Sequence, residues 1–176
     1  MLIHRAIEFA TIKHQGQYRK GTKTPYIVHP MEVMYILSQN GCGEEIVVAG
    51  ILHDTLEDTK TTREELEYYF GPKVAEMVAC ETEDKTKSWH ERKQATIDRL
   101  KSADYDVKLI RCADQLANIR SLFDTLKVEG DKTWTFFKAG KEDTEWYYRG
   151  VIDAMSELAD LDMYQELCYY FRIVFA

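Results

Sequence analysis

Four side chains in three separate stretches of the chain are of types that bind divalent metal ions. His29 lies upstream, the dipeptide His53-Asp54 ends an apolar run, and Asp114 lies far downstream among apolar residues. Two imidazoles and two carboxylates are a suitable ligand set for one divalent cation. An unpaired charge is expensive to bury in apolar surroundings, so such residues need a compensating partner. We therefore predict that these four side chains hold one metal ion.

Two further acids follow the His53-Asp54 dipeptide at helical spacing. His53 and Glu57 are four residues apart, as are Asp54 and Asp58. In a helix, residues four apart are neighbours on the surface. The sequence therefore predicts two additional carboxylates beside the metal site.

The flanking residues indicate how the remaining ligands would be presented. His29 directly precedes Pro30, which disfavours a helical backbone at the residue before it. We expect His29 to be extended, outside the helix that follows, and to project into a cleft. Asp114 is expected on a buried helix face, with Asn118 one turn later on the same side.

Each residue also has an ordinary structural explanation. A His-Asp dipeptide is common and often marks a helix cap or a solvent-facing pair, and Asp114 could simply pair with Arg111. Glu57 and Asp58 could form a solvated helix end. Short motifs have a high false-positive rate when they are taken one at a time.

The elements that position these residues are predicted to be helices throughout. Apolar residues recur at i, i+3 and i+4 spacing, Gly and Pro are scarce (9 and 3), and alternating strand patterns are hard to find. We predict an all-α protein of roughly eight to ten helices in a single domain, 1–176. Expected boundaries include helices near 44–56 and 106–126, candidate capping boxes at Thr62/Glu65 and Ser88/Glu91, and Pro72 at a helix start.

Composition excludes several classes of function. The 176 residues carry a net charge of -7 and no long basic stretch, so duplex nucleic acid is an unexpected partner. No apolar run is long enough to span a bilayer, and no signal peptide is evident. The four cysteines form no C-x-x-C pair, which favours a reduced, cytoplasmic protein. The sequence does not indicate an oligomeric state.

Taken together, the motifs resemble a known family. The chain is similar to metal-dependent phosphohydrolases of the HD superfamily, and in particular to the hydrolase domains of Rel/Spo-type guanosine tetraphosphate enzymes and their small stand-alone relatives. The resemblance covers roughly residues 1 to 126 well and the last third loosely. The matching segments are 14–20 (HQGQYRK), 24–30 (TPYIVHP), 53–59 (HDTLEDT), 70–75 (FGPKVA) and 113–120 (ADQLANIR).

The resemblance implies a compact multi-helix HD-domain fold and a role for each matching position. The metal would be Mn²⁺, with Fe²⁺ or Zn²⁺ also compatible with the ligand types. Glu57 and Asp58 would be the catalytic acidic pair beside the attacking water. Arg19 would lie against the guanine, with Lys20 nearby, and Asn118 would bond to the ribose or 3′-phosphate region.

The resemblance further implies an enzyme that removes the 3′-diphosphate from ppGpp or pppGpp, giving GDP or GTP and diphosphate. We expect a small phosphorylated nucleotide as its partner, and hydrolysis without synthesis. Two alternatives stay open: a nucleotide phosphomonoesterase of the same superfamily, and a non-catalytic metal-binding regulatory protein. Gln115 departs from the family pattern, because a basic residue often follows the metal-binding Asp.

Overall fold

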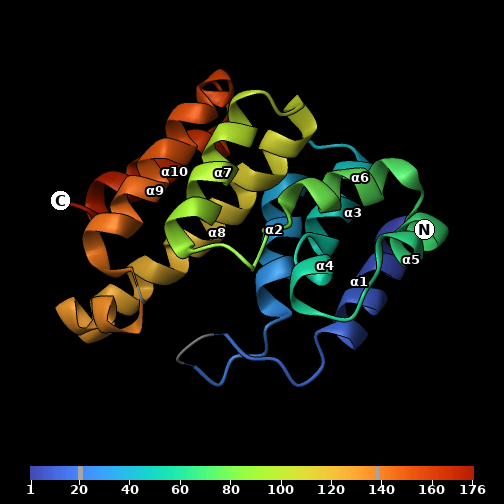
Figure 1. Cartoon of the computed structure of the whole chain (residues 1–176), viewed down its shortest axis with the longest axis horizontal. Helices are drawn as coiled ribbons and strands as arrows, with labels where there is room; N and C mark the ends of the chain where they lie inside the picture. The colour runs from blue at the N-terminus through green and yellow to red at the C-terminus, as the bar shows by residue number, and fades with distance from the viewer. Residues whose placement is uncertain (20–21, 138) are drawn as a thin grey trace.

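The computed structural model describes residues 1–19, 22–137 and 139–176, and in these ranges it contains α-helices and no β-strand. The all-α prediction is confirmed (Figure 1). The α-helices are α1 (Leu2–Lys13), α2 (Val28–Gln39), α3 (Glu44–Leu52), α4 (Thr55–Asp58), α5 (Arg63–Phe70), α6 (Pro72–Glu81), α7 (Trp89–Lys101), α8 (Tyr105–Glu129), α9 (Gly140–Ala154) and α10 (Asp162–Val174). Two short 3₁₀ helices, η1 (Gly130–Phe136) and η2 (Ser156–Leu158), flank α9.

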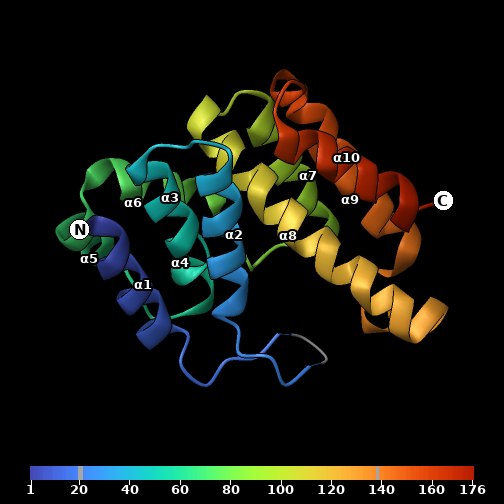
Figure 2. The same ribbon diagram turned by 180° about the vertical axis from the view of Figure 1, so that it is seen from behind.

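The long helix α8 joins the two ends of the molecule. Helices α1 to α6 gather at one end and α9 and α10 at the other, as Figures 1 and 2 show from opposite sides. α8 packs against α2, α3 and α6 from the first group and against α10 from the second. Because its stretch from Val107 to Ala117 is buried throughout, its polar side chains there must find partners inside the protein.

Helices α2 and α3 approach each other closely at Gly50. A Cβ atom at this position would lie 2.4 Å from Cδ1 of Leu37 on α2, which is far too close. Glycine therefore permits this contact, and Val33 and Leu37 are fully buried beneath it. His53 follows the carboxyl end of α3, and His29 lies at the amino end of α2. The close packing of the two helices places these ends next to each other.

The expectation that His29 is extended was wrong. α2 begins at Val28, so both His29 and Pro30 are in its first turn. The first four backbone N–H groups of a helix have no acceptor within it, so a proline there removes no helical hydrogen bond. The N–H of His29 instead donates to the carbonyl of Tyr26, at 3.0 Å.

The predicted helix over 44–56 is divided in two. α3 ends at Leu52 and the short α4 starts at Thr55. The hydroxyl of Thr55 donates to the carbonyl of Leu52 at 2.7 Å, and so competes for the acceptor that would continue the helix. The N–H of Asp58 still donates to the carbonyl of Asp54 at 2.9 Å, so the predicted four-residue spacing survives across the break.

The predicted helix starts agree well with the structure. Ser88 and Glu91 form the complete capping box of α7, and Pro72 opens α6. At the start of α5 only half of the predicted capping box forms: Thr62 accepts a hydrogen bond from the N–H of Glu65, but the side chain of Glu65 pairs with Lys13 at 2.7 Å. The helix expected over 106–126 extends a little further, from Tyr105 to Glu129. Across the described ranges, no helix combines the length and apolar character that crossing a membrane requires.

Candidate metal and active site

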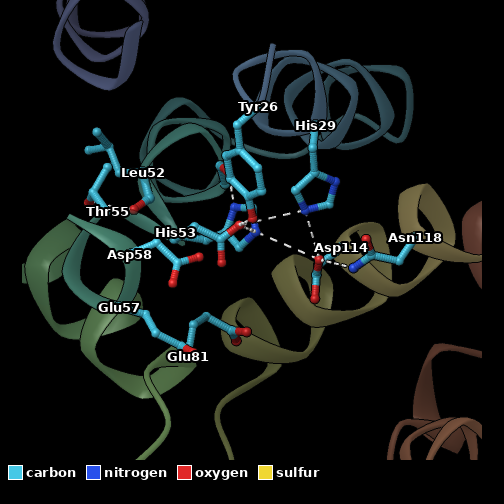
Figure 3. Close-up of polar contacts among 12 residues, drawn as sticks. Tyr26, His29, Leu52, His53, Thr55, Glu57, Asp58, Glu81, Asp114 and Asn118 are labelled. Carbon is cyan, nitrogen blue, oxygen red and sulfur yellow. Dashed lines mark hydrogen bonds and ion pairs between the residues drawn. The ribbon is translucent and has the colours of Figure 1, made fainter. Parts of the chain in front are cut away.

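Three of the predicted ligands, His29, His53 and Asp114, point toward one another in Figure 3. The fourth, Asp54, faces both histidines. His29 comes from the first turn of α2, His53 and Asp54 from the break between α3 and α4, and Asp114 from the middle of α8. Ligand atoms of His29, His53 and Asp114 all lie within 4.8 Å of one another, and all three residues are buried. These helices are far apart in sequence, so the tertiary packing described above creates the cluster.

The two carboxylates face the same two imidazole nitrogens. Oδ1 of Asp114 lies 3.1 Å from Nε2 of His29 and 3.6 Å from Nε2 of His53. Oδ2 of Asp54 lies 2.9 Å from Nε2 of His53 and 3.7 Å from Nε2 of His29. Two nitrogens and two oxygens that point at each other over such distances form a possible site for a divalent cation.

The hydrogen bonds of His53 fit a cation at this point. Its Nδ1 lies 2.8 Å from the carbonyl oxygen of Gly50, which can only accept, so Nδ1 carries a proton. In the neutral ring, Nε2 then presents a lone pair. This buried nitrogen has no hydrogen bond of good geometry among the described residues, although two carboxylates face it. A lone pair opposite two carboxylates is unfavourable, and either a proton on Nε2 or a cation between the three groups would relieve it.

Without a cation, the cluster strongly perturbs its own protonation. Burial disfavours the charged form of His53, but the carboxylates of Asp54 and Asp114 outweigh it and raise the pKa of His53 well above 6.5. Burial would raise the pKa of both Asp54 and Asp114, yet contacts with the two histidines hold each pKa below its usual range. Without a cation, a proton on His53 therefore offsets part of the negative charge of the two carboxylates, and a bound cation would take the place of that proton.

Tyr26 orients Asp54. Its hydroxyl donates to Oδ2 of Asp54 at 2.5 Å, and its ring packs against the rings of His14 and His29. Burial and the charge of Asp54 raise the pKa of Tyr26 far above its usual range, so the hydroxyl stays protonated as a donor. Sequence reasoning assigned Tyr26 no role, although its position three residues before His29 is a signal that it could face the same site.

Three donors orient Asp114. Asn118 donates to Oδ1 at 2.7 Å, whereas Gln115 and Arg111 donate to Oδ2 at 2.9 and 3.2 Å. The ordinary explanation that Asp114 pairs with Arg111 is therefore correct, but this pairing occupies only the oxygen that faces away from the histidines. Gln115, the departure from the family pattern, is buried and acts as a hydrogen-bond donor here.

The acidic pair lies beside the cluster, on the α4 side (Figure 3). Lys85 contacts Oδ1 of Asp58 at 2.9 Å and the carbonyl of Glu57 at 2.8 Å, and the N–H of Glu83 donates to Oε2 of Glu57 at 3.3 Å. Burial and the charges of Glu83 and Asp58 raise the pKa of Glu57 above 4.5. An open hollow of about 640 Å³ adjoins the pair and is lined in part by Lys13, Lys60 and Lys85.

Of the three predicted nucleotide contacts, two lie together. Arg19 donates from Nη2 to Oδ1 of Asn118 at 3.1 Å, and its guanidinium carbon lies 6.0 Å from the centre of the Tyr26 ring. Asn118 thus connects Arg19 to Asp114. Lys20, the third, lies outside the described residues.

Sequence reasoning also missed Glu81. This acid ends α6, one turn after Met77 and Val78 on the buried face, and only 5% of it is exposed. It forms an ion pair with Arg111 at 2.5 Å. An acid at an apolar position of the helical pattern is the signal that could have identified it.

Comparison with known proteins agrees with this geometry. A protein-family profile described as an HD domain matches residues 6–144. The chain belongs to the HD domain family. The HD-domain match includes all four residues of the cluster, and HD-domain hydrolases bind divalent metal.

Individual relatives are similar over most of this HD domain. The guanosine-3′,5′-bis(diphosphate) 3′-pyrophosphohydrolase MESH1 of Xenopus tropicalis is 44% identical over 124 residues, which make up 69% of each chain. The crystal structure of lmo0812 from Listeria monocytogenes has a TM-score of 0.79 at 35% identity, covering 88% of this chain and 100% of that one. The structure of a metazoan orthologue of SpoT that hydrolyses ppGpp has a TM-score of 0.85 at 30% identity, covering 98% and 94%.

Proposed function

We propose that this HD domain removes the 3′-diphosphate of ppGpp or pppGpp, releasing diphosphate and GDP or GTP. The observation that carries the proposal is the convergence of His29, His53, Asp54 and Asp114 on one point. The substrate is proposed from the relatives, because the metazoan MESH1 proteins are named as hydrolases of this 3′-diphosphate.

We propose these four side chains as the ligands of one divalent ion, with Mn²⁺ as the first choice. Mixed imidazole and carboxylate ligation suits Mn²⁺, Fe²⁺ and Zn²⁺. A bound divalent cation supplies charge that neutralises phosphate oxygens and lowers the pKa of water.

The acidic pair is proposed to handle the proton of the attacking water. A carboxylate can accept this proton as the water attacks phosphorus. Lys85 contacts Asp58 and the backbone of Glu57, which holds the pair in place beside the cluster. A binding protein without turnover would not need a proton acceptor here, which favours an enzyme.

The nucleotide is proposed to lie against Arg19 and Asn118. A planar guanidinium can stack on a base and also bind phosphate, and Asn118 offers an amide beside the cluster. Lys20 is proposed as a nearby phosphate contact. A phosphorylated small molecule, rather than nucleic acid, is proposed to enter through the hollow beside the acidic pair. Lys60 lines this hollow together with Lys13 and Lys85, which are paired with Glu65 and Asp58.

The chain 1–176 is proposed to act as a single domain in the cytoplasm. Its four cysteines, Cys42, Cys80, Cys112 and Cys168, are all free thiols, as in proteins of reducing compartments.

The decisive experiment offers the Mn²⁺-loaded protein a panel of phosphorylated nucleotides and identifies the released phosphorus species. We expect diphosphate from ppGpp and pppGpp, and about 10²- to 10⁴-fold slower release from an Asp58→Asn variant that still contains metal. Release of orthophosphate from a monoester would favour the phosphomonoesterase instead. A metal-loaded protein that releases neither species from any substrate would favour the regulatory alternative.

A further inference from the structure

A buried ion pair lies directly behind the metal cluster. Nη2 of Arg111, on α8, lies 2.5 Å from Oε2 of Glu81, at the end of α6, and also donates to the backbone carbonyl of Glu81 at 3.2 Å. The side chains are 8% and 2% exposed. Figure 3 shows Glu81 near the acidic pair, with its carboxylate turned towards α8.

The pair is connected to the cluster through one oxygen of Asp114. Nη1 of Arg111 donates to Oδ2 of Asp114, and so does the side-chain amide of Gln115. Because Oδ2 receives two donors, the carboxylate cannot turn freely. Its other oxygen, Oδ1, therefore remains directed at His29 and His53.

Stability alone does not explain this arrangement. Burying two charges costs several kcal/mol per ion, and apolar side chains of similar volume often serve a fold as well as or better than an ion pair. Neither carboxylate oxygen of Glu81 has a hydrogen bond of good geometry among the described residues. Burial raises the pKa of Glu81, and the charge of Arg111 is the strongest influence that opposes this shift. An incompletely satisfied buried acid calls for another explanation.

The balance of charges around Asp114 provides an explanation for this buried ion pair. If Arg111 faced Asp114 alone, the guanidinium would cancel the negative charge that should attract a cation. With Glu81 on its other side, Arg111 is shared between two carboxylates, and the three groups keep one net negative charge. Arg111 can then hold Asp114 in place without neutralising the site.

We propose that Arg111 and Glu81 are a positioning pair for Asp114: Arg111 holds Oδ2 so that Oδ1 faces the metal, and Glu81 offsets the charge of Arg111. This inference rests on the proposed metal site. Neither residue touches the substrate or the cation. Groups in this position typically change metal affinity by about 10- to 100-fold when they are removed.

The test separates positioning from stability. We would compare Arg111→Met with the double variant Arg111→Met/Glu81→Met, in which neither buried charge is left alone and flexible methionines fill the space. The matched control is Lys108→Met, which removes another buried cation of α8 that contacts Glu157 at 3.0 Å, away from the cluster. Mn²⁺ dissociation constants come from calorimetry, and stability comes from urea unfolding with a chelator present.

We expect Arg111→Met to lose stability and to bind Mn²⁺ about 10- to 100-fold more weakly. The double variant should regain stability yet still bind Mn²⁺ weakly, whereas Lys108→Met should keep wild-type affinity. If the double variant binds Mn²⁺ as tightly as wild type, the pair is a structural feature only and the inference is overturned. If wild type itself does not bind Mn²⁺, the metal site fails, and this inference fails with it.

Discussion

Replacing Tyr26 by Phe would test how much the hydroxyl of Tyr26 contributes to orienting Asp54 in the proposed metal site. The substitution removes the 2.5 Å hydrogen bond to Oδ2 of Asp54 and keeps the ring that packs against His14 and His29. It does not change the charge, because burial and Asp54 raise the pKa of Tyr26 and keep the hydroxyl protonated. Any effect is therefore that of one lost donor.

The expected magnitude follows from the charged acceptor. A hydrogen bond to a charged group contributes about 1.5–3 kcal/mol, so the metal-free protein should lose stability in that range. The same oxygen faces both imidazoles, and without Tyr26 the carboxylate of Asp54 can rotate away from them. Metal affinity should fall by about 10- to 100-fold, as is usual when a partner of a ligand is removed.

Calorimetric titration with Mn²⁺ measures the affinity, and urea unfolding with a chelator measures the stability. Tyr164→Phe is the matched control, because its hydroxyl donates to the backbone carbonyl of Ile152 at 3.0 Å, away from the cluster. The control should lose about 1 kcal/mol of stability and no metal affinity. Equal Mn²⁺ affinity in Tyr26→Phe and wild type would refute the proposed orientation of Asp54.

Three further predictions concern turnover. Asp58→Asn should keep its metal but lose about 10²- to 10⁴-fold in turnover, measured as diphosphate release, and normal activity would remove Asp58 from the mechanism. Arg19→Ala should raise the Michaelis constant for ppGpp more than it alters metal content; an unchanged constant would contradict the nucleotide contact. Burial and the charges of Glu83 and Asp58 raise the pKa of Glu57 above 4.5, so its carboxylate form, and with it turnover, should appear only as the pH rises through that raised pKa. Glu57→Gln should abolish this acidic limb of the pH profile, and persistence of the limb would assign it to another group.

Much of the fold could be predicted from the sequence because helix starts and ends depend on residues close together in the chain. The capping box of Ser88 and Glu91 and the proline that opens α6 are short-range devices, and both predictions are confirmed. The extended backbone expected at His29 was wrong because the preference of a residue before proline is weak compared with a helix packed onto its neighbours. The break after Leu52 was also not predicted; the hydroxyl of Thr55 donates to the carbonyl of Leu52 there, a contact that the helical pattern of the sequence does not reveal.

Some features of the candidate site could likewise be predicted from the sequence, and others could not. Residue types and helical spacing indicated that the two histidines, the two aspartates and the acidic pair form a group, because imidazoles and carboxylates in apolar sequence need a partner. The resemblance to the HD family supplied their roles. Their roles as ligands and proton acceptors remain predictions.

The tertiary structure alone decided how that group is arranged. It packs α3 against α2 at Gly50 and directs one oxygen of Asp114 towards the histidines. It also places Tyr26 against Asp54, and Arg111, which pairs with Glu81, against Asp114. Glu81 and Asp114 belong to different helices, and no pattern of neighbouring residues in the sequence predicts which helix faces will pack together. Such contacts depend on side-chain packing over the whole core, so they form only in the folded chain and cannot be deduced from a short stretch of sequence.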